Sequence, residues 1–151
     1  MTVSALFRNA LLLGASVTFL AGAHAQNECP AGRDMADTQL QGRWSGSVEG
    51  QPGSVRIELG PHPDRDGTAK GYIFRGDARL PMVGDVDDGT VTLEESADGV
   101  HITGTWLGQV VDGSCGREIR GDYLRDEQAR PSPFVLRKQQ PLRPDHAPTP
   151  P

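Results

Sequence analysis

Polar and apolar side chains alternate residue by residue over most of positions 40–138, and this period of two constrains the fold more than any other feature. In the segment 40–48, the even positions hold Leu, Gly, Trp, Gly and Val, whereas the odd positions are all polar. Successive side chains of a strand point to opposite faces, so the pattern predicts strands with one buried and one solvated face. The helical period of 3.6 is almost absent from this region.

Asp-Gly pairs lie between many of the alternating segments, at positions 66–67, 88–89, 98–99 and 112–113. Gly adopts positive φ without strain and Asp tolerates it, so these pairs predict tight hairpins. We expect eight strands, over residues 40–48, 54–60, 68–75, 78–83, 90–95, 100–107, 117–124 and 133–138. Short connections favour antiparallel neighbours, because parallel strands need crossovers of about a dozen or more residues.

The 151 residues fit one domain, which we expect to be all-β. The predicted fold is a single eight-stranded antiparallel up-and-down barrel over residues 40–138, with a β-sandwich as the alternative. Glycines within the strands favour the barrel, because Gly eases the bending of a closed sheet. Residues 26–39 are interpreted as an N-terminal arm held at Cys29, and the proline-rich residues 139–151 as an extended, disordered tail.

The first 25 residues have the layout of a secretory signal peptide. Arg8 is their one charged side chain, an apolar segment runs from Ala10 to Ala21, and Ala23-His24-Ala25 forms a small-x-small cleavage pattern. The apolar segment is too short for a bilayer, which needs about 20 apolar residues. Cleavage after Ala25 predicts a periplasmic or secreted protein with no membrane span in the mature chain.

The two cysteines, Cys29 and Cys115, are expected to form a disulfide, because thiols of exported proteins pair in an oxidising compartment. A redox-active thiol is the alternative. The chain has no C-x-x-C motif, and no histidine or basic residue adjoins Cys29, so the structural disulfide is favoured.

Charge and motif content exclude several classes of function. A formal net charge of -5 opposes binding to phosphate backbones, so nucleic acid is not an expected partner. The acidic segment 85–89 with Glu94 does not match a calcium loop, because its Gly and Glu fall out of register. No pair of histidines has metal-ligand spacing, and no nucleophile elbow or phosphate loop is present. We expect no metal, no cofactor and no enzymatic activity.

Gly42-Arg43-Trp44 resembles the G-x-W on the first strand of lipocalins and other calycin-type barrels. In those families a basic residue late in the last strand stacks on the Trp and closes one barrel end, a part that Arg137 or Lys138 would take here. The motifs Gly71-Tyr72-Ile73-Phe74 and Pro133-Phe134-Val135-Leu136 extend a looser likeness to small exported bacterial β-proteins of unassigned function. This likeness implies a fold and a compartment but no activity.

The segment Thr105–Gln109 is similar to the T-W-x-G-Q of some avidins, which are exported eight-stranded barrels too. A biotin pocket needs several ring-stacking Trp residues, and this chain has only Trp44 and Trp106, so avidin-like binding is a remote alternative.

The aromatic side chains either fill the barrel or line a pocket within it. The candidate ligand-binding residues are Trp44, Tyr72, Phe74, Trp106 and Tyr123. The resulting hypothesis is an exported, non-enzymatic β-barrel that binds a small apolar or amphipathic ligand. The alternative is a protein-binding module, such as a periplasmic inhibitor of a hydrolase, that acts through the loops 60–68 and 108–117.

Overall fold

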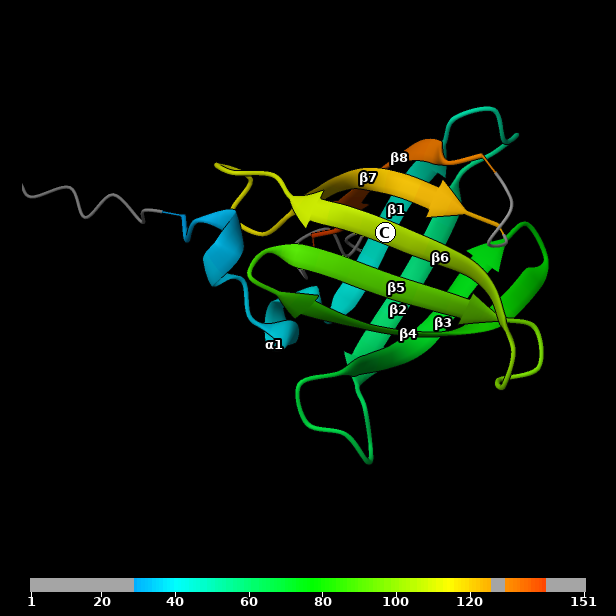
Figure 1. Cartoon of the computed structure of the whole chain (residues 1–151), viewed down its shortest axis with the longest axis horizontal. Coiled ribbons are helices and arrows are strands. Elements are labelled where there is room, and N and C mark those ends of the chain that lie inside the picture. Colours follow the sequence, from blue (N-terminus) through cyan, green and yellow to red (C-terminus); the bar gives the residue numbers. More distant parts are fainter. Residues whose placement is uncertain (1–28, 126–129, 141–151) are drawn as a thin grey trace, which may run out of the picture.

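The protein, seen here in a computed structural model that describes residues 29–125 and 130–140, forms a closed barrel of eight antiparallel strands (Figure 1). Each strand pairs with the next in sequence, and the last pairs back with the first. The strands are β1 (Gly42–Val48), β2 (Val55–Pro61), β3 (Ala69–Arg75), β4 (Ala78–Asp87), β5 (Thr90–Ser96), β6 (Ile102–Val110), β7 (Glu118–Leu124) and β8 (Ser132–Lys138). The predicted up-and-down barrel is confirmed, and the sandwich is excluded.

Every second side chain of each strand points into the barrel, as the alternation predicts. In β5, Val91, Leu93 and Glu95 are buried, whereas the side chains between them are partly exposed. Trp44 and Trp106 are the largest fully buried side chains, with exposed fractions of 1% and 0%. Side chains thus pack the interior, which is the usual state of a small eight-stranded barrel.

Two strands begin later than their alternation predicts. The segment 40–48 was expected to be a strand, but β1 starts at Gly42, because Leu40 is the last residue of a short helix. The segment 100–107 was expected to be a strand, but β6 starts at Ile102 and runs on to Val110. The backbone N–H groups of Val100 and His101 both donate to Oδ1 of Asp98, each at 2.8 Å. Because these donors are used in the turn, the two residues do not join the strand ladder.

The N-terminal arm packs over one end of the barrel, in a 3₁₀ turn η1 (Gly32–Asp34) and a short helix α1 (Asp37–Leu40) (Figure 1). Met35 and Leu40 are buried there, and the N–H of Gly32 donates to Oδ1 of Asp112 at 2.8 Å. The sequence predicted attachment at Cys29 alone, whereas the structure holds the arm along its length. We call this the closed end of the barrel.

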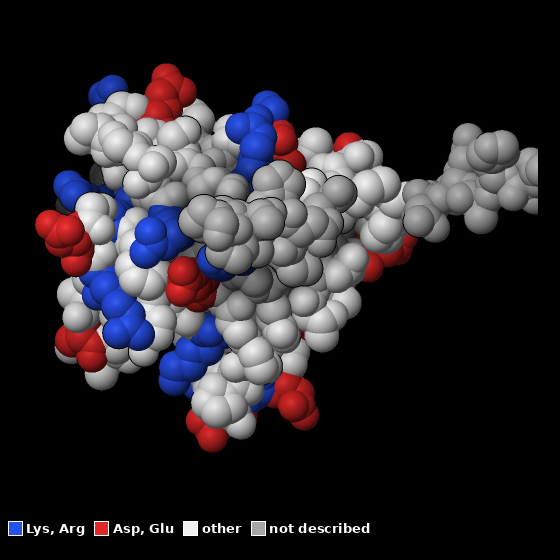
Figure 2. Space-filling view, turned by 180° about the vertical axis from the view of Figure 1, so that it is seen from behind, with Lys and Arg blue, Asp and Glu red and all other residues white. Residues whose placement is uncertain are grey.

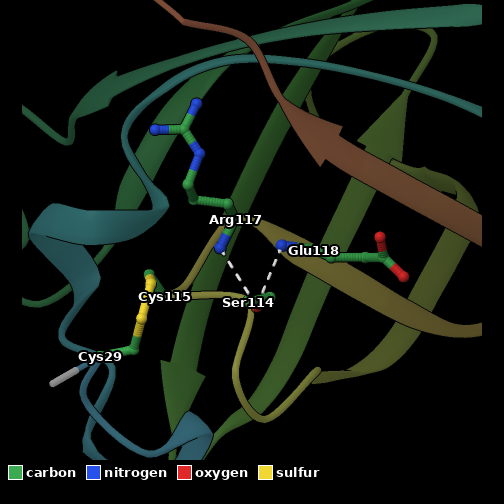
Figure 3. Close-up of a disulfide and its surroundings, with 5 residues drawn as sticks. All are labelled: Cys29, Ser114, Cys115, Arg117 and Glu118. Carbon is green, nitrogen blue, oxygen red and sulfur yellow. Dashed lines mark hydrogen bonds between the residues drawn. A yellow bond between two sulfur atoms is a disulfide. The ribbon is translucent and has the colours of Figure 1, made fainter.

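The predicted disulfide between Cys29 and Cys115 is confirmed, and it ties the arm to the β6–β7 connection (Figure 3). Next to it, Oγ of Ser114 accepts the N–H groups of Arg117 and Glu118, both at 3.3 Å (Figure 3). These bonds shape the connection as it enters β7. The predicted signal peptide and residues 141–151 of the predicted tail lie outside the described residues.

Candidate functional site

Trp44 seals the closed end of the barrel. Its indole Nε1 donates to the carbonyl of Leu40 at 2.8 Å, and Nζ of Lys138 lies 5.4 Å from the ring centroid while donating to the carbonyl of Gln39. Burial, together with the positive charge of Arg117, lowers the pKa of Lys138. Lys138 is therefore the basic residue of the last strand that lies next to Trp44. Its side chain points inward, like that of Leu136.

Arg137 has the outward parity in β8 and cannot reach Trp44. Its Nε donates instead to Oε2 of Glu118 at 3.0 Å on the outer face. The sequence left open whether Arg137 or Lys138 contacts Trp44. The alternation of side chains along β8 decides it, because neighbouring residues point to opposite faces.

Trp106 and Tyr123 form an aromatic cluster in the other half of the barrel, with ring centroids 4.7 Å apart. The Tyr123 phenol donates to Oε1 of Glu95 at 2.6 Å, and Nη2 of Arg75 lies 3.0 and 2.9 Å from the two Glu95 oxygens. Burial first, and then the bond to Glu95, raises the pKa of Tyr123 to about 12. The cluster is a hydrogen-bonded ion pair near the end of the barrel opposite the arm, which we call the open end.

Arg75 and Glu95 were not among the predicted site residues, although the sequence carries a signal for both. Glu95 continues the buried series Val91 and Leu93, and Arg75 follows Ile73 at the same parity. Charged side chains on the buried face of two strands predict an internal ion pair, because a single buried charge is costly.

Tyr72 and Phe74, two of the predicted ligand-binding residues, lie on the outer face of β3 and do not meet Trp44, Trp106 or Tyr123. The guanidinium carbon of Arg79 lies 3.4 Å from the Tyr72 ring centroid. That of Arg56 lies 4.3 Å from the Phe74 ring centroid. Both faces of β3 carry apolar residues, so alternation alone does not fix which face is buried.

A groove of about 660 Å³ lies over the outer face of β3, β4 and β5. We call it the outer groove. Its apolar lining includes Tyr72, Pro81, Val83, Val100 and Ile102. Among the described residues, the exposed large hydrophobic side chains are Tyr72 (38%), Val100 (79%), Ile102 (57%) and Leu107 (45%). All of these except Leu107 line the groove, so the exposed apolar surface of the protein is concentrated there.

The turn that presents Val100 is held firmly. Oγ of Ser96 accepts the Gly99 N–H at 2.8 Å, and Oδ2 of Asp98 lies 2.6 Å from Nδ1 of His101. This bond holds the pKa of Asp98 well below its usual range and raises the pKa of His101. Val100 is thus displayed to solvent by a structured turn.

Charge is unevenly distributed along the outer groove. Arg65 and Lys70 lie among its lining residues on the side of the β2–β3 connection, whereas Val100 and Ile102 come from the β5–β6 side. Figure 2, which shows the opposite side of the view in Figure 1, displays Lys and Arg interspersed with Asp and Glu. Glu94 also lines the groove, in register with Lys70 across β4. The groove thus combines an apolar part with a charged part in which Arg65 and Lys70 accompany one outward-facing carboxylate, so its excess of positive charge suits an amphipathic anion.

In the part of the chain that the structure describes, no group of three or more His, Cys, Asp or Glu side chains is placed to hold a metal ion. Neither helix within residues 29–125 and 130–140 is long and apolar enough to cross a membrane. Comparison with known proteins gives no match to a family model and none to a curated protein. The barrel is compatible with a lipocalin- or calycin-like fold.

Proposed function

We propose that this protein is an exported, non-enzymatic β-barrel that binds a small amphipathic acid in its outer groove. The observation that carries the proposal is the exposure of Val100, 79% exposed on a hydrogen-bonded turn beside Tyr72 and Ile102. Exposed apolar side chains that gather in one place are typical of a binding surface, because apolar surface in water is unfavourable and monomeric proteins seldom expose large patches of it.

The proposed ligand is amphipathic because the groove has both an apolar and a charged part. Val100, Ile102 and Tyr72 would cover the apolar part of the ligand, and Arg65 and Lys70 would attract its acidic group. Arg79 supports the Tyr72 ring from one side, which favours a fixed aromatic surface for the ligand.

The sequence hypothesis placed the ligand among aromatic side chains within the barrel, whereas we propose a ligand outside it. Trp44 and Trp106, at 1% and 0% exposure, occupy the space that an internal ligand would need. The protein-binding alternative, through the loops 60–68 and 108–117, stays a prediction.

The test is calorimetric titration with decanoate, decanol and decyltrimethylammonium. We expect decanoate to bind most tightly, with an affinity that falls as salt rises because the cationic end is exposed. Val100→Asp should weaken decanoate binding by about tenfold, since it places a like charge beside the apolar chain.

Leu107→Asp is the matched control, because Leu107 is exposed but lies outside the groove. Equal binding by both variants, or equal binding of decanoate and decyltrimethylammonium, would overturn the proposal.

Export is a separate part of the proposal, and it rests on the signal-peptide pattern and the disulfide. Expression of the full chain in a Gram-negative host should yield a periplasmic product whose N-terminal sequence begins at Gln26. Recovery of the uncleaved chain from the cytoplasm would contradict it.

A further inference from the structure

The open end of the barrel, opposite the arm, holds a second cavity of about 680 Å³ that shares no lining residue with the outer groove. Its lining includes Arg75, Arg125 and Gln51. We propose that this open-end cavity binds a small oxoanion, the carboxylate or phosphate group of a small molecule, on Arg75 with the assistance of Arg125.

Arg75 has hydrogen-bonding capacity left for such a ligand. A guanidinium carries five N–H donors, and Nη2 is directed to the two Glu95 oxygens. Nη1 reaches only Oε1 of Gln51, at a long 3.4 Å, and Nε has no partner among the described residues. Nε and Nη1 point to different edges of the guanidinium, so Nη1 offers one contact to a carboxylate or phosphate, and Arg125 in the same cavity offers a second.

The cluster beneath Arg75 holds its guanidinium in one position. Glu95 is 3% exposed and is itself fixed by the Tyr123 phenol, and the guanidinium carbon lies 5.1 Å from the Tyr123 ring and 5.4 Å from the Trp106 ring. Glu95 and Tyr123 are therefore positioning residues for the proposed anion contact. A donor that is already immobilised loses little conformational entropy when it binds.

The charge of the cavity supports an anionic ligand. Its described lining contains two arginines and no carboxylate, in a chain whose net charge is -5. Glu95 offsets the charge of Arg75, so Arg125 supplies the remaining positive charge among the described lining residues, and this charge attracts small anions.

The structure supplies a reporter for this site. The chain has two Trp residues. The buried indole Nε1 of Trp106 has no partner among the described residues, whereas that of Trp44, at the closed end, donates to Leu40. An anion on Arg75 should shift the Trp106 indole resonance in a ¹H–¹⁵N spectrum and leave the Trp44 resonance in place.

The experiment titrates inorganic phosphate and, separately, acetate into the ¹⁵N-labelled protein at constant ionic strength, with chloride as the reference. We expect a saturable shift of the Trp106 indole peak, assigned with Trp106→Phe. Arg125→Gln should raise the half-saturation concentration about fivefold or more, since one charge-assisted contact is lost. The anion with the lower half-saturation concentration is the preferred oxoanion.

Arg43→Gln is the control for net charge, because Arg43 is exposed on the outer face of β1. Arg75→Lys should also weaken binding, but it alters the buried ion pair, so Arg125→Gln decides the result. A non-saturable shift with both anions, or equal half-saturation in Arg125→Gln and Arg43→Gln, would overturn the inference. Val100→Asp should leave the response unchanged, which separates this site from the outer groove.

Discussion

The phenol oxygen of Tyr123 lies 2.6 Å from Oε1 of Glu95 inside the barrel and donates a hydrogen bond to it. This contact joins β7 to β5 over Gly104 of the intervening strand β6, and Arg75 of β3 completes the cluster from a further strand. A charged group at this depth is stable only when its partners are in place. The cluster therefore links the stability of the barrel to the geometry of the open-end cavity.

Tyr123→Phe should lower the free energy of unfolding by about 1–3 kcal/mol, because it removes the phenol donor from a buried carboxylate whose Oε1 then keeps only the contact with Arg75. It should also change the response to alkaline pH. The folded pKa of Tyr123, about 12, lies above the ordinary tyrosine value of 10.0. Its stabilising contribution is therefore complete below the unfolded pKa and is lost as pH rises from about 10 to about 12.

The pH dependence can be measured by thermal unfolding of the wild type and Tyr123→Phe at pH values from about 9 to about 12, a range that spans the ordinary and the raised phenol pKa. The difference between the two proteins should shrink across this range. A constant difference would argue against the raised pKa.

Gly104→Ala should destabilise the barrel by about 1–3 kcal/mol, the usual effect of overpacking. A Cβ at Gly104 would lie 2.4 Å from Oε1 of Glu95 and 2.7 Å from the Tyr123 phenol oxygen. Gly60→Ala, in β2, is the control, because a Cβ there meets no described atom within 4 Å. Chemical denaturation should separate the two variants. Equal midpoints would contradict the packing of the cluster.

Lys138→Met should lower the melting temperature, because it removes both the cation next to the Trp44 ring and the donor to Gln39. A loss of about 1–2 kcal/mol is expected from such a contact. Arg137→Met, on the outer face, should have a smaller effect, since its partner Glu118 keeps a second bond to Arg120. A larger effect at Arg137 would contradict the assignment of Lys138 as the residue that seals the closed end.

Cys29→Ser should lower the melting temperature in oxidising buffer, because the disulfide closes a loop across 86 positions. Loop entropy gives roughly 4–5 kcal/mol as an upper figure. Reductant should destabilise the wild type and leave Cys29→Ser unchanged. Identical melting of the wild type with and without reductant would remove the stabilising role of the disulfide.

The period of two and the Asp-Gly turns were sufficient to predict the strands, because both are local properties of the chain. Hairpins between neighbours then leave few topologies open, and the closed barrel is one of them. The disulfide was predictable because the chain has only two cysteines. The start of β6 was not, since it depends on which backbone donors the Asp98 carboxylate takes.

The candidate sites were less predictable than the fold. Tyr72 and Phe74 were grouped with Trp106 as ligand-binding residues because all are aromatic, yet the parity of β3 turns these two outward. Of these two residues, only Tyr72 lines the outer groove, the proposed ligand site. Val100 was predicted to begin a strand, because an apolar residue beside a turn resembles the first residue of a strand, whereas the structure exposes it on the turn.

Sequence alone determined the strand order, the buried parity of most strands and the partner of each cysteine, since local patterning and short connections specify them. Tertiary structure decided that Lys138 meets Trp44, that Arg75, Glu95 and Tyr123 meet inside the barrel, and that Val100 joins Tyr72 along one groove. These contacts join residues from different strands. They depend on how far the closed sheet staggers each strand against its neighbours, and no local pattern encodes that distance.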